Sequence, residues 1–323
     1  MVTKLGEFDV IARYFRRPAR RAVLGVGDDC ALLGPEPGQQ WAVSTDMLVE
    51  GRHFLAGTDP RRLGHKTLAV NLSDLAAMGA RPHSFVLALA LEQPDPGWLE
   101  AFSGGLLALA DEHDIELVGG DTTRGPLNLC VTVLGLVPEG LALRRDAARA
   151  GDELWISGTP GQARLALGHL LGEWELPPAL LQRVLPRLEQ PQPRVALGLA
   201  LRGVAHAAID ISDGLLGDLR HVLEASAVGA VVELDALPAC EVLAQQPQAR
   251  RRACQLAGGD DYELLFTAAP ARRDDVLRAA AQAGVAVTAI GSIEPEPGLR
   301  LRDAGGRSMA ADFFPSFDHF LQP

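Results

Sequence analysis

Five short carboxylate motifs interrupt apolar or glycine-rich stretches of this 323-residue chain. They are Gly-Val-Gly-Asp-Asp (25–29), Ser-Thr-Asp (44–46), Asn-Leu-Ser-Asp-Leu-Ala-Ala-Met-Gly (71–79), Gly-Gly-Asp-Thr-Thr (119–123) and Asp-Ile-Ser-Asp-Gly (210–214). A carboxylate inside an apolar run is costly unless a partner compensates its charge. No Lys or Arg adjoins these aspartates, and converging aspartates repel one another. Bound divalent cations resolve both problems, and hard oxygen ligands favour Mg²⁺.

The bulk composition narrows the class of protein. Acidic residues number 41 against 30 basic ones, and the net charge of −11 argues against a nucleic-acid or anionic-membrane partner. A hydrophobic content of 47% is enough for a full core, and 323 residues suggest one large or two ordinary domains.

Cysteine spacing and apolar runs predict a soluble, cytoplasmic protein. The four cysteines, at 30, 130, 240 and 254, form no C-x-x-C pair and are expected to be buried or idle thiols. The N-terminus carries charges where a signal peptide needs an apolar core. The longest apolar run, 85–91, is too short to span a bilayer.

Hydrophobic periodicity predicts an α/β fold (α+β by some schemes) with two domains, 1–140 and 141–323, divided at the turn 138–140. In the first half, strands are expected at 41–45, 84–91, 115–118 and 127–137, with helices at 60–78 and 96–113, the latter capped by Asp95. In the second half, strands are expected at 153–157, 206–211, 229–234, 262–267 and 286–291. Helices are expected there at 161–171, 193–202, 214–226 and 271–283, and helical pieces joined by turns at 177–193.

The carboxylates recur where strands are expected to end. Asp46 ends one predicted strand, Asp121 another, and Asp210 with Asp213 a third, and ligand sites in α/β sheets gather at the carboxyl ends of strands. Asp74 differs, because it lies in a predicted helix that must turn its face toward the site. Each motif alone is also typical of a tight turn or a helix cap. Together they favour metal–phosphate chemistry.

The glycine pattern excludes the commonest phosphate-binding loops. Neither a Gly-x-x-x-x-Gly-Lys-Ser/Thr loop nor a Gly-x-Gly-x-x-Gly turn is present, so phosphates would rest on metals, glycine amides and scattered basic residues. Gly119-Gly120-Asp121 offers bare amides beside a carboxylate, and 258–261 (Gly-Gly-Asp-Asp) repeats that composition.

Three further features allow two interpretations each. His53 is either structural or a contact to a substrate phosphate. Arg145 is either solvated or paired with nucleotide phosphates. The aromatic tail either docks on the core or stacks on a flat heteroaromatic substrate. Its members are Phe313, Phe314, Phe317 and Phe320.

Taken in order, the motifs resemble those of thiamine-monophosphate kinases over nearly the whole chain. The matching strings begin with Gly-Glu-Phe-Asp-Val-Ile-Ala-Arg-Tyr-Phe (6–15) and end with Gly-Gly-Asp-Asp-Tyr-Glu-Leu (258–264). The resemblance places the chain in the aminoimidazole-ribonucleotide synthetase superfamily. It implies two α/β domains, an active site in the cleft between them, and a homodimer whose N-terminal domains pair strands into a shared barrel.

The resemblance also implies a reaction and its residues. The γ-phosphate of ATP, bound mainly by the N-terminal domain, passes directly to thiamine monophosphate in the last step of thiamine diphosphate biosynthesis. Several Mg²⁺ ions are expected on Asp29, Ser44, Thr45, Asp46, Asp74, Asp121, Asp210 and Asp213. ATP contacts are expected at Gly120, Asp121, Arg145 and Ser212. Substrate contacts are expected at His53, Asp260 and Phe317, where the family often has Glu in place of Asp260 and a hydroxylated aromatic or Trp in place of Phe317.

The chemistry of such a transfer needs no general base. A phosphate monoester has a second pKa of about 6, so the acceptor oxygen is ionised near neutral pH. The obstacle is bringing two polyanions together, which metals overcome. We therefore predict no covalent phospho-enzyme and no side chain that performs acid–base catalysis.

Three alternatives stay open. The first is another superfamily enzyme acting on a different phosphoryl acceptor or amide; the absence of a reactive Cys near the N-terminus disfavours selenophosphate chemistry. The second is a non-catalytic Mg²⁺–nucleotide sensor. The third is a metal-dependent phosphatase that releases phosphate without ATP.

Overall fold

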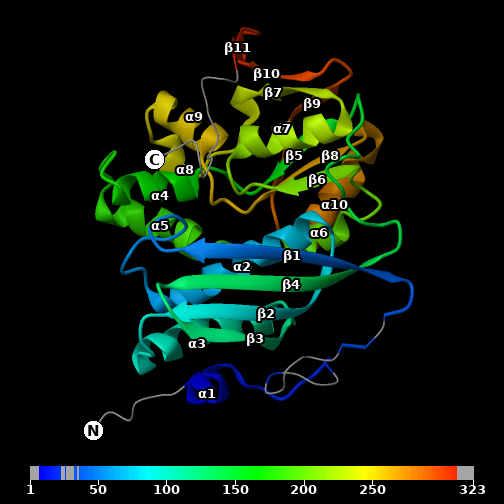
Figure 1. Ribbon diagram of the computed structural model, residues 1–323. Coiled ribbons are helices and arrows are strands. Elements are labelled where there is room, and N and C mark those ends of the chain that lie inside the picture. The colour runs from blue at the N-terminus through cyan, green and yellow to red at the C-terminus, as the bar shows by residue number, and fades with distance from the viewer. Residues whose placement is uncertain (1–6, 23–25, 27–32, 35, 311–323) are drawn as a thin grey trace. The chain divides into compact units, whose positions relative to one another are not determined.

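The computed structural model describes residues 7–22, 26, 33–34 and 36–310, and it divides the chain into two compact units. Unit 1 comprises 1–75 and 80–140, and unit 2 comprises 76–79 and 141–323. Each unit contains its own β-sheet (Figure 1).

Unit 1 alternates strands and helices after a short N-terminal segment. That segment contains α1 (Glu7–Val10) and the π-helix η1 (Ile11–Phe15). The remaining elements are β1 (Gln39–Val49), α2 (Pro60–Ala77), β2 (Arg81–Leu91), α3 (Pro96–Glu112), β3 (Glu116–Arg124) and β4 (Asn128–Pro138). Asp95 caps α3 as predicted, because its side chain accepts a hydrogen bond from the Trp98 N–H at 2.6 Å.

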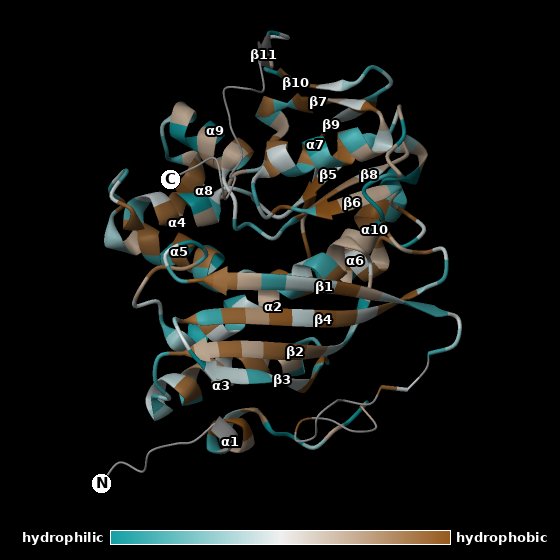
Figure 2. Cartoon of the chain, viewed as in Figure 1, coloured by the Kyte–Doolittle hydropathy of each residue, from teal (hydrophilic) through white to brown (hydrophobic). Residues whose placement is uncertain are grey.

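The sheet of unit 1 has the strand order β1-β4-β2-β3. β1 pairs antiparallel with β4, β4 antiparallel with β2, and β2 parallel with β3. β1 and β3 are therefore the two edge strands of this sheet. Figure 2 shows that the central strands β4 and β2 are predominantly hydrophobic.

One face of this sheet is buried and the other is open. Apolar residues at alternate positions of the central strands form the buried face, namely Phe85, Leu87, Leu89, Leu129, Val131 and Val133. The opposite face of β1 exposes Trp41, Val43 and Met47 by 38%, 61% and 52%. These three apolar side chains are therefore exposed in a single copy of the chain.

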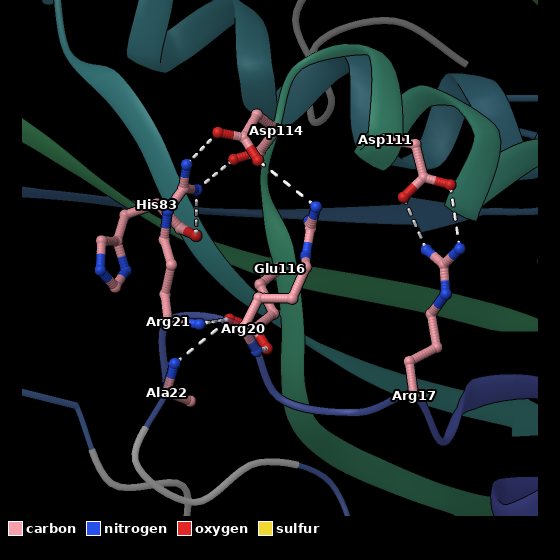
Figure 3. A network of polar contacts seen from close by, with 8 residues as sticks. All are labelled: Arg17, Arg20, Arg21, Ala22, His83, Asp111, Asp114 and Glu116. Carbon is pink, nitrogen blue, oxygen red and sulfur yellow. Dashed lines mark hydrogen bonds and ion pairs between the residues drawn. The ribbon is translucent and has the colours of Figure 1, made fainter.

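The segment before β1 is tied to the β3 edge by one carboxylate. Glu116 accepts hydrogen bonds from the main-chain N–H groups of Arg20, Arg21 and Ala22 at 2.5, 2.7 and 3.2 Å (Figure 3). Burial of Glu116 opposes its ionisation, but these N–H groups outweigh burial and lower the pKa of Glu116.

Arginine side chains reinforce the same segment. The Arg17 guanidinium binds Asp111 through two bonds of 2.8 and 2.9 Å, and Arg20 and Arg21 pair with Asp114. These contacts fix the segment to α3 and the start of β3.

Unit 2 contains a mixed seven-stranded sheet with helices between its strands. Its strands are β5 (Glu153–Ser157), β6 (Ala207–Asp210), β7 (Gly229–Glu233), β8 (Leu264–Ala268), β9 (Val287–Glu294), β10 (Gly298–Arg302) and β11 (Ser308–Ala310). Its helices are α4 (Gln162–Leu170), α5 (Pro178–Glu189), α6 (Val195–Ala200), α7 (Leu215–Ser226), α8 (Glu241–Ala244), α9 (Gln248–Ala257) and α10 (Arg273–Ala283). Short 3₁₀ turns occupy η2 (Leu234–Ala236) and η3 (Pro270–Arg272).

The strand order in unit 2 is β11-β10-β7-β9-β5-β8-β6. Only β10 and β7 are parallel; every other neighbouring pair is antiparallel. The main core lies between this sheet and α7, with Leu216, Leu219 and Ile209 among its buried members. A second cluster joins α4, α5, α8 and α9.

Several sequence predictions differ from the structure in detail. β1 and β3 continue beyond residues 45 and 118, so Asp46 and Asp121 lie inside strands and not at their ends. Backbone pairing with β4 and β2 extends both strands through polar residues that a hydrophobic pattern does not mark. The stretch 177–193 contains one twelve-residue helix, α5, and the sequence analysis missed α8, α9, β10 and β11.

Candidate functional site

In unit 1, β1 and α2 bring three of the predicted ligands to one place. Ser44 and Asp46 lie on the same face of β1, because alternate residues of a strand share a face. The Ser44 hydroxyl donates to Oδ2 of Asp74 at 2.5 Å. Asp74 is half-buried in a helix whose neighbouring residues are almost all buried, so this helix face does turn toward the carboxylates.

A fully buried amide supports this arrangement, and the sequence analysis did not identify it. The Asn71 side chain accepts a hydrogen bond from the Asp46 N–H at 3.1 Å and donates to the Thr67 carbonyl at 3.1 Å. Asn71 and Asp74 are three positions apart in α2 and lie on neighbouring parts of its surface. The Asn-Leu-Ser-Asp spacing was therefore the available signal.

Thr45 points away from this group. Its side chain is exposed on the opposite face of β1, where its hydroxyl lies 2.8 Å from that of Thr132. Ser44 and Asp46 therefore share one face of β1 and the Thr45 side chain lies on the other, because strand geometry sends successive side chains to opposite faces.

Gly120 and Asp121 lie on β3, at the opposite edge of the sheet from β1. The register runs from Asp46 through Val131 and Leu87 to Gly120, one residue per strand. Three inter-strand steps amount to about 14 Å, too far for two short aspartate side chains to reach one ion. The structure of one copy therefore does not bring Asp46 and Asp121 together.

Gly120 approaches the neighbouring strand closely. Its φ is +151°, and a Cβ at this position would lie 1.9 Å from the Leu87 carbonyl oxygen. Only glycine fits such a position, which explains why the polar Gly-Gly-Asp motif can continue as a strand. Asp121, the next residue, is exposed.

His53 is held in a tight turn that follows β1. Its N–H donates to the Val49 carbonyl at 3.0 Å, and its ring Nδ1 accepts from the Val49 N–H at 3.0 Å. A neutral ring whose Nδ1 is an acceptor carries its proton on Nε2. This makes Nε2–H a donor suited to an anionic oxygen.

In unit 2, four predicted residues lie on two segments that run side by side. Asp210 is the last residue of β6, and Ser212 and Asp213 follow it before α7. The Asp260 N–H donates to the Ser212 carbonyl at 2.8 Å, and the Tyr262 N–H donates to the Ile211 carbonyl at 2.8 Å. These bonds extend the pairing of β6 with β8 beyond the strand ends.

The loop that carries Asp260 is conformationally unusual. Asp260 and Tyr262 adopt left-handed φ values of +64° and +50°. A Cβ on Gly259 would lie 2.4 Å from the Ser212 carbonyl oxygen, so this glycine allows the two segments to approach. Non-glycine residues in this conformation are strained and concentrate at functional sites.

Asp218 is a buried carboxylate that the sequence analysis did not identify. Its Oδ2 accepts from the N–H groups of Asp213 and Gly214 at 3.2 and 3.1 Å. Burial, together with the negative charges of Asp210 and Asp213, raises the pKa of Asp218 to about 8. A cation near these aspartates would relieve that repulsion.

The second half of the Gly-Gly-Asp-Asp-Tyr-Glu motif has a structural role. Asp261 accepts from the Gly161 N–H at 2.7 Å at the start of α4, and burial raises its pKa. Glu263 is buried, binds Arg194 through bonds of 2.6 and 2.5 Å, and accepts from the Ser157 hydroxyl at 2.5 Å. Both carboxylates hold the ends of the loop that presents Asp260.

The three remaining predicted site residues are Arg145, Asp29 and Phe317. Arg145 is exposed in a turn, where its carbonyl accepts from the Ser226 hydroxyl at 2.9 Å. Asp29 and Phe317 lie outside the described residues.

The carboxylate and hydroxyl oxygens described above suit a Mg²⁺ ion that is bound partly by the protein and partly by substrate phosphates. Within the described part of the chain, no group of three or more His, Cys, Asp and Glu side chains is arranged to hold a metal ion. Mg²⁺, however, is commonly bound through one or two carboxylates together with waters and substrate phosphates. The Ser44, Asp46 and Asp74 oxygens, and those of Asp210 and Asp213, are hard ligands of this kind.

In the ranges that the structure covers, no helix is long and apolar enough to cross a bilayer.

Two family models and a curated relative match most of this chain. Residues 27–137 match the AIR synthase related protein N-terminal domain, and residues 149–304 match the corresponding C-terminal domain. Thiamine-monophosphate kinase of Salmonella typhimurium is 45% identical, covering 98% of this chain and 99% of the relative.

Solved structures give the same result. Thiamine-monophosphate kinase from Stenotrophomonas maltophilia K279a has a TM-score of 0.84 and 46% identity, covering 93% of this chain and 95% of that one. A structure described as AaThiL complexed with AMPPCP and TMP has a TM-score of 0.77 and 28% identity, covering 89% of each chain.

Proposed function

Because this chain belongs to the thiamine-monophosphate kinase family, with AIR synthase related N- and C-terminal domains, we propose that it transfers the γ-phosphate of ATP to thiamine monophosphate. The products are thiamine diphosphate and ADP. The observation that carries the proposal is the bond between Ser44 and Asp74 beside Asp46, in a chain that matches such kinases over 98% of its length. A neighbour described as complexed with AMPPCP and TMP supports the choice of both substrates.

Each unit supplies hard oxygen ligands for Mg²⁺ in this proposal. Bound Mg²⁺ neutralises the phosphate oxygens and aligns donor with acceptor. In unit 1, Ser44, Thr45, Asp46 and Asp74 would hold metal, with the Thr45 side chain on the opposite face of β1 from the other three. Asp121, Asp210, Asp213 and Asp29 complete the proposed set.

Other residues bind and orient the two substrates. His53 donates from Nε2 to a phosphate oxygen of thiamine monophosphate, as its Nδ1 bond to Val49 favours. Asp260 and Phe317 are the other proposed substrate contacts. Gly120, Asp121, Arg145 and Ser212 are the proposed ATP contacts, through main-chain amides, a carboxylate, a guanidinium and a hydroxyl.

The transfer proceeds in line and without a covalent enzyme intermediate. The acceptor oxygen is ionised near neutral pH because the second phosphate pKa is about 6, so no side chain has to remove a proton. The protein's task is to place and neutralise two polyanions, which accords with many carboxylates and no nucleophile–base pair in the motifs.

We also propose that the active protein is a homodimer built from the sheets of unit 1. Each copy offers two edge strands, β1 and β3, and the exposed apolar residues Trp41, Val43 and Met47. Placing β1 of one copy beside β3 of the other would close eight strands into a barrel and cover these edges. That closure would place β1, which carries Asp46, next to the strand that carries the partner's Asp121, which one copy alone cannot do.

The decisive experiment incubates purified protein with Mg-ATP and thiamine monophosphate and measures thiamine diphosphate and ADP. Equal amounts of both products support the proposal. Phosphate release from thiamine monophosphate without ATP would instead identify a phosphatase. ATP binding without ADP formation, when selenide and formylglycinamidine ribonucleotide are also tested, would identify a nucleotide sensor.

A further inference from the structure

Lysine is nearly absent from this chain, yet one lysine is buried near the candidate site. The sequence contains 28 arginines and only two lysines, Lys4 and Lys66. Lys66 lies in α2 and is 3% exposed. The enclosed position 66 therefore carries an ammonium in a chain whose basic residues are almost all arginine.

The Lys66 ammonium contacts the turn that carries His53. Its Nζ donates to the His53 carbonyl oxygen at 3.0 Å. The His53 N–H and ring Nδ1 are both bonded to Val49, and the Gly51 N–H closes the turn by donating to the Phe54 carbonyl at 2.8 Å. The N–H and the carbonyl of His53 are thus both hydrogen-bonded, and its ring is held through Nδ1.

The shape of the donor explains why arginine does not serve here. An ammonium is a compact charge with three donors, whereas a guanidinium is a planar fork that needs more room and matches carboxylates or phosphates. A buried ammonium must also be compensated by hydrogen bonds, so its acceptors are well defined. A main-chain carbonyl of a tight turn is an acceptor that a point donor can reach.

We propose that Lys66 is a positioning residue for the phosphoryl acceptor: its ammonium holds the His53 turn so that the His53 Nε2–H faces a phosphate oxygen of the acceptor. This inference rests on the proposed function, because it concerns the same substrate site. It assigns Lys66 no contact with the substrate and no proton transfer. Its effect passes through His53.

Lys66→Met and Lys66→Gln test the proposal by steady-state kinetics. Lys66→Met removes the donor, and we expect the KM for thiamine monophosphate to rise about tenfold while the KM for Mg-ATP changes less than twofold. Lys66→Gln keeps a shorter N–H donor, and the expected KM is intermediate. The matched control is Thr67→Val, which removes a neighbouring buried hydroxyl bonded to the Leu63 carbonyl at 2.7 Å without touching the turn.

A double-mutant cycle with His53→Gln separates positioning from general stability. If Lys66 acts through His53, then Lys66→Met adds little to the KM once His53 is replaced. Nitrogen-15 NMR of the histidine rings gives a readout independent of turnover. The wild-type His53 signal should show the Nε2–H tautomer, and Lys66→Met should shift that signal, whereas Thr67→Val should not.

The outcomes distinguish the two proposals. If the wild type makes no thiamine diphosphate, the proposed function fails, while the NMR comparison still tests the link between Lys66 and His53. If the wild type is active and both Lys66 variants retain its KM and its His53 signal, the positioning role is overturned. Equal effects of Lys66→Met in the presence and absence of His53 would overturn it too.

Discussion

Ser44 on β1 and Asp74 on α2, thirty positions apart in sequence, share a hydrogen bond of 2.5 Å. The bond joins a strand to a helix at a point where the only carboxylate of a buried helical stretch meets the candidate metal ligands. A hydroxyl that donates to a carboxylate compensates part of the cost of burying its charge. The pair therefore explains how an aspartate can occupy an otherwise buried helix.

Replacing Asp74 tests whether its charge serves metal binding. Asp74→Asn keeps the shape of the side chain and an acceptor for Ser44 but removes the charge, so we expect kcat to fall by about a hundredfold or more. The unfolding temperature should change little. Ser103→Ala, which truncates another buried hydroxyl in unit 1, is the control. An active Asp74→Asn protein with normal Mg²⁺ dependence would contradict the ligand assignment.

Mixing two inactive variants tests whether the site is shared between copies. Asp46→Asn and Asp121→Asn should each abolish turnover alone. In a mixed dimer whose sites combine Asp46 with the partner's Asp121, one site carries both changes and the other carries none. Activity should return to about a quarter of wild type after unfolding and refolding an equal mixture, because half the dimers are mixed and each has one intact site. Failure of the mixture to regain activity would place both residues in one copy's site or rule out the dimer.

The pKa of Asp218 predicts a pH-dependent cost that a cation should relieve. Its folded pKa of about 8 lies above the unfolded value near 4, so the folded state binds the proton more tightly. The contribution of Asp218 to stability should therefore fall as pH rises from about 4 to about 8. Asp218→Asn keeps an acceptor for the Asp213 N–H and removes this cost.

Melting curves measure the effect. We expect Asp218→Asn to raise the unfolding temperature by about 2 °C or more at pH 8, by less at pH 5, and by less again with Mg²⁺ present. An equal change at both pH values would show that the Asp218 carboxyl group titrates normally.

The contribution of Glu116 to stability depends on pH in the opposite direction from that of Asp218. Its lowered pKa means that its contribution to stability is complete above the unfolded pKa and is lost as pH falls through the folded pKa. Glu116→Gln weakens three bonds to main-chain N–H groups, each worth about 1.5–3 kcal/mol when the acceptor is charged.

Hydrogen exchange at the Arg20, Arg21 and Ala22 amides reports this loss locally. We expect these amides to exchange faster in Glu116→Gln than in wild type near neutral pH. Glu112→Gln, at an exposed neighbouring carboxylate, should leave them unchanged. Equal protection in Glu116→Gln would mean that arginine side chains alone hold the segment.

The sequence predicted the presence of most helices and strands better than it predicted where each one begins and ends. Periodicity located β2, β4, α2, α3 and the main strands of unit 2, because these carry strong apolar patterns. It ended β1 and β3 too early, since polar Asp46 and Asp121 are kept in strands by backbone pairing. It missed α9, whose first residues are mostly polar or charged.

The site was predicted in parts for a similar reason. Motifs identified Ser44, Asp46, Asp74 and the segments of Asp210 and Asp260, which the structure does bring together within each unit. They did not reveal that Thr45 points to the opposite face or that Asp121 lies at the far edge. Those facts depend on strand parity and sheet order. Asn71, Lys66 and Asp218 were missed because they act by holding main-chain groups, and a motif does not display such bonds.

The bonds from Glu116 to residues 20–22 span 94 to 96 positions of the chain. During synthesis the first residues leave the ribosome long before their acceptor does, at about 5–20 residues per second. For several seconds, then, the arginine-rich segment before β1 is synthesised but has no acceptor, because β3 and the end of α3 have not yet been made. In that interval the segment lacks the bonds that hold it in the folded protein, so a protease acting on the nascent chain would find it accessible.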